Sequence, residues 1–177
     1  MLLIIGAGAI FYFQNNAKSE NPEQSSVPDK AVNSEQTRVA AIDLSFQDLE
    51  GNTHKLSDFK GKVIILNMRA RSCSACAYEN KFLESLYSQI KSNANIELIP
   101  IFEGESRDII LRYIKAVDIN YPVYVDQLEL SLYKYRVNAF PTSFIIDKEF
   151  RVVTMTRGAL DWSSDKVVQY LNQLGNE

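Results

Sequence analysis

The sequence has few of the residues on which many kinds of functional site depend. Its 177 residues include only two cysteines and one histidine, His54. A structural zinc site needs four ligands, which one histidine and one cysteine pair do not provide. Two cysteines also cannot form the several disulfides that stabilise small secreted domains. We therefore expect no metal site and no multi-disulfide scaffold, and we expect His54 to be a surface side chain.

Clusters of basic residues and glycine-rich loops are missing as well. The chain has 19 Lys and Arg against 22 Asp and Glu, a formal net charge of −3. No basic patch with interleaved aromatic residues occurs, so nucleic acid is not an expected partner. Gly6 and Gly8 lie in an apolar stretch with no strand before them, which does not fit a phosphate-binding loop. We expect no dissociable cofactor.

One long uncharged run stands at the N-terminus. Residues 1–16 begin with MLLIIGAGAIFYF. A helix over these letters would rise roughly 20 Å, which is shorter than a ~30 Å bilayer core, so the run fits a cleaved signal segment or a membrane anchor. An N-terminal core helix is the alternative, although no amphipathic stripe appears. Residues 17–38 are polar and cannot bury enough surface to fold alone, which predicts a flexible linker.

Residues 39–177 alternate between strand and helix patterns. LSFQDLEGNTHKL (44–56) alternates around a Gly-Asn turn, as a β-hairpin does. KVIILNM (62–68) and IELIPIF (96–102) are continuous apolar runs, as expected for strands that are buried on both faces. TSFIID (142–147) is followed by a turn and a second strand pattern, which predicts an antiparallel pair.

Helical patterns separate these strands. Apolar residues recur at helical spacing after the first and second buried strands and again near the C-terminus. In the first of these helices the apolar face consists of Phe82, Leu83, Leu86 and Ile90. The order of elements predicts an α/β fold in which a central mixed sheet is flanked by helices and preceded by an N-terminal β-hairpin.

The two cysteines stand three positions apart, where a buried strand gives way to a helix. They occur in NMRARSCSACAYE, residues 67–79. A helix N-terminus carries free N–H groups and partial positive charge, which should lower the pKa of Cys73 below ~8.5. Cys73 is then the nucleophile, and Cys76, one turn later, is the resolving thiol. A metal half-site or a chance pairing is the alternative.

A proline further along the chain strengthens the redox interpretation. In NAFPTSFIID, Pro141 directly precedes a predicted strand. Proline adopts the cis form at tolerable cost, and a cis-proline facing the cysteines would leave the Phe140 backbone free to pair with a substrate strand. The alternative is an ordinary trans proline at a strand entry.

Taken together, these motifs resemble the TlpA/ResA-like branch of the thioredoxin superfamily. The resemblance covers about residues 42–174 and includes FQDLEGNTHKLSDFKGKVIILN as well as the two motifs above. It implies a thioredoxin-like fold and a membrane-anchored or exported thiol-disulfide oxidoreductase. Several members reduce disulfides in apocytochromes or other extracytoplasmic proteins.

Particular residues take their roles from this resemblance. Glu79 matches an active-site glutamate that could hold a proton during exchange; a solvated residue near the helix start is the alternative. The usual aromatic residues before the first cysteine are replaced by Met68, Arg69 and Ser72, and with Arg71 nearby the surroundings of the motif contain two cations, Arg69 and Arg71. These two cations could lower the pKa of Cys73 and make the pair more oxidising, or they could be solvated and bind an acidic partner.

Three functions follow for comparison. The first is disulfide exchange with protein substrates by a domain on the outer side of a cell membrane or secreted, with electrons passing to or from another thiol protein, which we expect to be membrane-embedded. The second is a peroxiredoxin-like peroxidase, which MRARSC does not support because it lacks the expected Pro and Thr. The third is a non-catalytic binding module with a structural cysteine pair.

Overall fold

The computed structural model describes residues 38–177. The predicted signal or anchor segment (1–16) lies outside the described residues, as does all of the predicted linker except Arg38. Arg38 donates to the carboxylate of Asp147 at 3.1 Å. Within residues 38–177 no helix has both the length and the apolar character needed to cross a membrane.

Strands and helices follow one another along the described chain. The strands are β1 (Val39–Ala40), β2 (Ser45–Asp48), β3 (Thr53–Lys55), β4 (Val63–Arg69), β5 (Ile96–Glu103), β6 (Tyr124–Asp126), β7 (Thr142–Ile146) and β8 (Arg151–Arg157). The helices are the 3-10 helix η3 (Leu56–Phe59), α1 (Ser74–Ile90), α2 (Arg107–Val117), α3 (Leu130–Tyr135) and α4 (Asp165–Asn176).

All eight of these strands form one mixed sheet in the order β1-β8-β7-β4-β5-β6-β2-β3. The central strands β4, β5 and β6 are parallel. On one side β7 pairs antiparallel with both β4 and β8, and on the other side β2 of the β2–β3 hairpin pairs antiparallel with β6. The predicted hairpin is therefore present, with Phe46 opposite His54. Strand β4 is buried along its whole length, as its continuous apolar sequence predicts.

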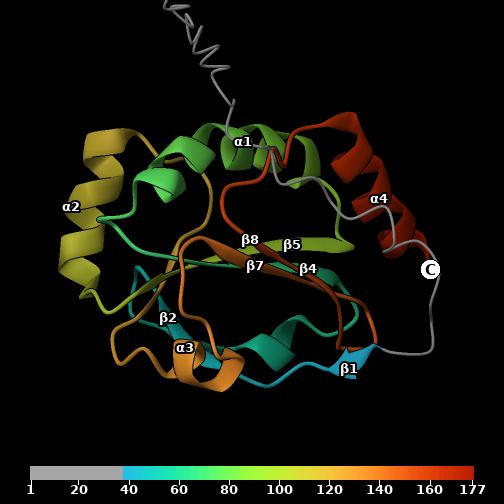
Figure 1. Cartoon of the computed structure of the whole chain (residues 1–177), viewed down its shortest axis with the longest axis horizontal. Helices are drawn as coiled ribbons and strands as arrows, with labels where there is room; N and C mark the ends of the chain where they lie inside the picture. Colours follow the sequence, from blue (N-terminus) through green and yellow to red (C-terminus); the bar gives the residue numbers. More distant parts are fainter. Residues whose placement is uncertain (1–37) are drawn as a thin grey trace, which may run out of the picture.

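Helices cover both faces of the sheet, which confirms the predicted α/β class. Figure 1 shows α1, α2 and α4 on one side and α3 on the other. Buried side chains of α1 (Leu83, Leu86 and Ile90) pack with Val63 and Ile65 of β4 in the first core. The neighbouring β4 residues point the opposite way and join a second core beneath η3 and α3. Because side chains alternate along a strand, odd-numbered residues of β4 face α1.

Candidate active site

The sheet register brings the two sequence motifs to the same edge. Strand β4 ends at Arg69, four residues before Cys73, and α1 begins immediately after that cysteine. Met68 is paired with Thr142 of the antiparallel strand β7. Pro141, which precedes Thr142, therefore lies at the end of the sheet where β4 leads into α1.

The cysteines are joined by a disulfide at the start of α1. Cys73 is the N-cap residue, and its Sγ accepts a hydrogen bond from the Cys76 backbone N–H at 3.0 Å. A sulfur in this position accepts a hydrogen bond from one of the N–H groups that have no partner within the helix. It also lies next to the partial positive charge of the helix N-terminus. Cys73 is half-buried, whereas Cys76 is only 1% exposed. A visiting thiol or disulfide can therefore reach Cys73 and not Cys76.

Glu79 lies inside the protein, one turn beyond Cys76, and is 0% exposed. Its Oε1 accepts from the indole N–H of Trp162 at 2.8 Å and from the Leu160 backbone N–H at 3.2 Å. Its Oε2 accepts from Asn67 at 3.0 Å. The alternative of a solvated Glu79 is therefore wrong.

Burial raises the pKa of Glu79 above its ordinary value because it disfavours the charged carboxylate. The hydrogen bond from Trp162, the positive charge of Arg69 and the other donors act in the opposite direction and only partly offset burial. A buried carboxyl beside the cysteine pair can accept a proton during exchange and release it afterwards. Trp162 packs in the first core, and its indole N–H is also a hydrogen-bond partner of Glu79.

The Phe140–Pro141 peptide bond is cis, as predicted. Pro141 is buried, and its carbonyl accepts from the Gly158 backbone N–H at 2.8 Å. Phe140 is half-buried and packs against the second core. The loop that carries both residues connects α3 to β7.

The interpretation of Arg69 as a solvated cation that binds an acidic partner is wrong. Arg69 is 0% exposed because odd-numbered positions of β4 point beneath α1. Its guanidinium donates to the Cys76 carbonyl at 2.6 Å, to the Tyr121 hydroxyl at 2.9 Å and to the side-chain oxygen of Asn80. It also lies over the ring of Phe102, 5.2 Å from the centroid. Arg69 therefore cannot contact a partner directly.

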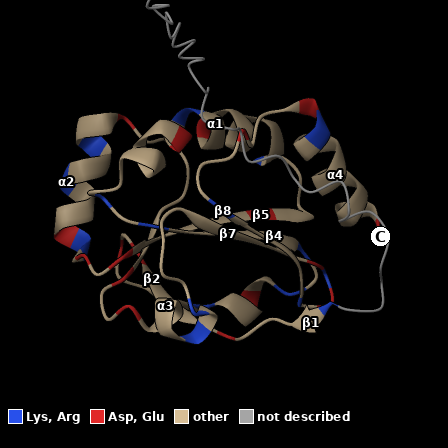
Figure 2. Cartoon of the chain, in the orientation of Figure 1, with Lys and Arg blue, Asp and Glu red and all other residues tan. Residues whose placement is uncertain are grey.

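Arg71 does reach the surface. Its side chain is 44% exposed, and its Nε donates to the carboxylate of Glu105 at 3.1 Å. Figure 2 shows that basic and acidic positions are interspersed, with both signs on α2 and on α4. Arg71 is thus one member of an exposed ion pair, and its predicted role toward a partner stays a prediction.

A second buried carboxyl, which sequence analysis did not identify, ends strand β5. Glu103 is 3% exposed, and its Oε1 accepts from the Ser131 hydroxyl at 2.6 Å. Its Oε2 has no hydrogen-bond partner among residues 38–177. Burial, together with the charges of Asp126 and Glu129, raises the pKa of Glu103 to about 8, although the hydrogen bond from Ser131 acts in the opposite direction.

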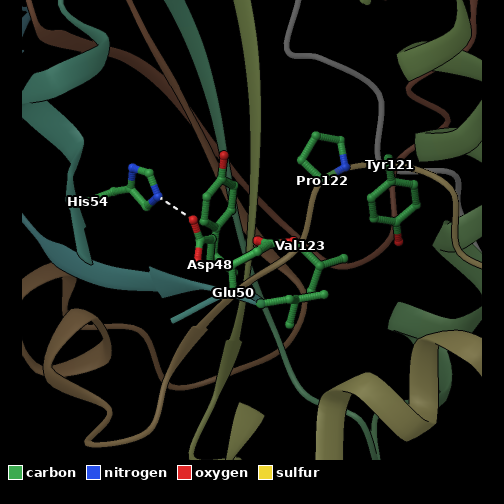
Figure 3. A pocket seen from close by; sticks show the side chains of 8 residues that line it. Asp48, Glu50, His54, Tyr121, Pro122 and Val123 are labelled. Carbon is green, nitrogen blue, oxygen red and sulfur yellow. Dashed lines mark hydrogen bonds and ion pairs between the residues drawn. The ribbon is translucent and has the colours of Figure 1, made fainter. Parts of the chain in front are cut away.

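A hollow of about 310 Å³ lies beside the hairpin, away from the cysteines. Figure 3 shows His54 and Asp48 on its hairpin side, with Tyr121 and Pro122 opposite. His54 pairs with Asp48 at 2.8 Å, which holds the pKa of Asp48 well below its ordinary value. His54 is partly exposed, at 32% of its side chain. No group of three possible metal ligands occurs in the part of the chain that the structure describes.

Comparisons with known proteins agree with this geometry. A family model described as the AhpC/TSA family matches residues 37–155. A thiol-disulfide oxidoreductase ResA from Bacillus thuringiensis subsp. konkukian is 31% identical over 127 residues, which cover 72% of this chain and 72% of that protein. ResA from Bacillus subtilis (strain 168) is 30% identical over 126 residues, covering 71% and 69%.

Solved structures share the fold. The exposed lipoprotein thioredoxin Etrx1 of Streptococcus pneumoniae is 27% identical, with a TM-score of 0.65 over 75% of this chain and 100% of that one. A secreted thiol-disulfide isomerase from Corynebacterium glutamicum is 22% identical, with a TM-score of 0.70 over 88% and 98%. The predicted thioredoxin-like fold and TlpA/ResA resemblance are confirmed. The chain therefore belongs to the AhpC/TSA family, in which it is a ResA/TlpA-like thiol-disulfide oxidoreductase.

Proposed function

We propose that this oxidoreductase acts outside the cytoplasm, attached to a membrane through residues 1–16, and exchanges disulfides with extracytoplasmic proteins. The uncharged N-terminal sequence and the likeness to a secreted and a lipoprotein relative support this location. Apocytochromes are among the substrates that the family resemblance suggests. A second thiol protein, embedded in the same membrane, would restore the starting redox state of the pair.

In the reducing direction, the Cys73 thiolate attacks a sulfur of the substrate disulfide. The substrate S–S bond breaks, one substrate sulfur leaves as a thiolate, and the other forms a mixed disulfide with Cys73. Cys76 loses its proton to Glu79 and attacks the Cys73 sulfur, which releases the second substrate thiolate. The pair has then lost two electrons and the substrate has gained two. The oxidising direction is the reverse of these steps.

The observation that carries this proposal is the unequal burial of two cysteines in one disulfide. The sulfur of Cys73 caps α1 and is half-buried, while Cys76 is enclosed next to the turn that bears Glu79. Substrate would meet Cys73 beside the Phe140–Pro141 loop. Arg71, at the exposed approach to α1, would contact acidic partners there.

The test is to trap the mixed disulfide in cells. Cys76→Ser should accumulate adducts between Cys73 and its protein substrates, because nothing then resolves the bond. Adducts are separated on non-reducing gels and identified after reduction, with Cys73→Ser as the matched control that should capture none. Equal capture by both variants, or none by either, would argue against disulfide exchange. Rapid oxidation of Cys73 by peroxide would favour a peroxidase instead.

A further inference from the structure

Arg69 is a buried cation whose bonded neighbours are all neutral. The three groups that accept its hydrogen bonds are a backbone carbonyl, the Tyr121 hydroxyl and the Asn80 amide oxygen. Its Nε has no hydrogen-bond partner among the described residues. A guanidinium stays charged at every accessible pH, and an interior position is strongly unfavourable for it unless negative charge lies nearby.

One source of negative charge is the carboxyl of Glu79. The positive charge of Arg69 opposes the effect of burial on the pKa of Glu79, although burial remains the larger influence. Glu79 is held by three other donors and forms no direct hydrogen bond with Arg69. Glu79 carries negative charge only while its carboxyl has lost its proton, and burial raises its pKa, so Glu79 alone does not provide a constant counterion.

A second negative charge appears during catalysis, on the resolving cysteine. Only a thiolate attacks a disulfide, so Cys76 has to lose its proton before the mixed disulfide resolves. Cys76 is 1% exposed, and burial disfavours the charged form of a thiol. The guanidinium of Arg69 is bonded to the carbonyl of this same residue.

We propose that Arg69 is a positioning residue that provides the positive charge for the Cys76 thiolate when the mixed disulfide resolves. The inference rests on the proposed exchange function and assigns this step an internal counterion. The Cys76 proton passes to the ionised carboxylate of Glu79, which becomes neutral, and the thiolate attacks the Cys73 sulfur. The bond between Cys73 and the substrate sulfur then breaks, and that sulfur leaves with the electron pair.

Asn80 and Tyr121 fix the guanidinium in this place. The Tyr121 hydroxyl bonds both to Arg69 and to the Asn80 side-chain oxygen, at 2.9 and 3.0 Å. Asn80 follows Glu79 on α1, while Tyr121 comes from the segment before β6. The planar, multiply donating guanidinium suits three separate acceptors, whereas a lysine ammonium would keep the charge with fewer fixed directions.

The test measures resolution with a small chromogenic disulfide, so that no protein substrate is needed. Reduced protein reacts with 5,5′-dithiobis(2-nitrobenzoate); Cys73 displaces one coloured thiolate and Cys76 then displaces the second. Stopped-flow absorbance follows the second release over the pH range in which thiols titrate. In the unaltered protein the midpoint should lie below the ~8.5 of a free cysteine, despite burial.

Variants separate charge from structure. Arg69→Gln keeps polar groups without charge and should raise the midpoint by roughly one pH unit or more, with resolution about 10-fold slower at neutral pH. Arg69→Lys keeps the charge and should stay closer to the unaltered protein. Lys81→Gln removes an exposed cation from the same helix and is the matched control, with the midpoint unchanged. Far-UV circular dichroism checks that each variant is folded.

The outcomes distinguish this inference from the function on which it rests. If the unaltered protein gives no second release, disulfide exchange itself is refuted. If release occurs with a midpoint at or above ~8.5, or if Arg69→Gln leaves the profile unchanged, the role of Arg69 is refuted and exchange stands. The midpoint is measured on the unaltered protein, so a value at or above ~8.5 refutes the role of Arg69 even if Arg69→Gln does not fold.

Discussion

Replacing Glu103 by glutamine should make the protein more stable at neutral and alkaline pH. The pKa of Glu103 rises from its ordinary value of 4.5 to about 8 because its carboxyl is buried. Between these two values the folded protein keeps a proton on Glu103 that the unfolded chain has lost. Stability therefore falls as pH rises through this window. Below it both states are protonated, and above it both are ionised.

The size of the effect follows from the two pKa values. Each tenfold difference in proton affinity is worth about 1.4 kcal/mol, so ionised Glu103 costs the folded state about 5 kcal/mol above pH 8. Glutamine resembles the neutral acid, and its carbonyl can accept the Ser131 hydroxyl as Oε1 does. Between pH 5 and pH 8 the unaltered protein should lose about 3 to 4 kcal/mol more than Glu103→Gln.

Urea unfolding of the oxidised proteins at both pH values measures this difference. Glu79 titrates in both proteins, so its contribution cancels. Glu50→Gln, which removes an exposed carboxyl from the turn between β2 and β3, is the control and should change the pH dependence little. If Glu103→Gln and the unaltered protein lose stability in parallel, Glu103 is not held protonated in the folded state and the reasoning fails.

Two smaller predictions concern neighbours of the redox pair. Trp162→Phe removes the indole donor from the Glu79 carboxylate and should raise the pKa of Glu79 further, which moves the pH midpoint of resolution upward. Stopped-flow release of the chromogenic thiolate measures it, and an unmoved midpoint would mean that Glu79 does not take the proton. Arg71→Gln breaks an exposed ion pair with Glu105 and should cost at most about 0.5 kcal/mol, or about 2 °C in thermal unfolding. A much larger loss would show that this pair is structural.

Local sequence patterns were sufficient to predict the elements that carry the cysteines. β4 is a continuous apolar run, and the apolar spacing of α1 places Leu83, Leu86 and Ile90 in the core as predicted. The cis form of Pro141 could be predicted because the pair of cysteines three positions apart, Cys73 and Cys76, precedes it in the sequence. The predictions of β4 and α1 succeed because neighbouring residues determine both elements, whereas that of Pro141 depended on the distant cysteine pair.

Burial of polar residues could not be predicted in the same way. Arg69 and Glu103 end their strands and look like surface residues in the sequence. Both are enclosed by segments distant along the chain: Tyr121 accepts from Arg69, and Ser131 donates to Glu103. For Arg69 one signal was present, because the even spacing from buried Ile65 places it on the face beneath α1.

The indole of Trp162 gives the enzyme a built-in optical label. Trp162 is the only tryptophan in the chain and donates directly to Glu79, 2.8 Å away. Its fluorescence should therefore change whenever the carboxyl gains or loses its proton. No dye or tag is then needed to observe the interior of this redox centre during turnover.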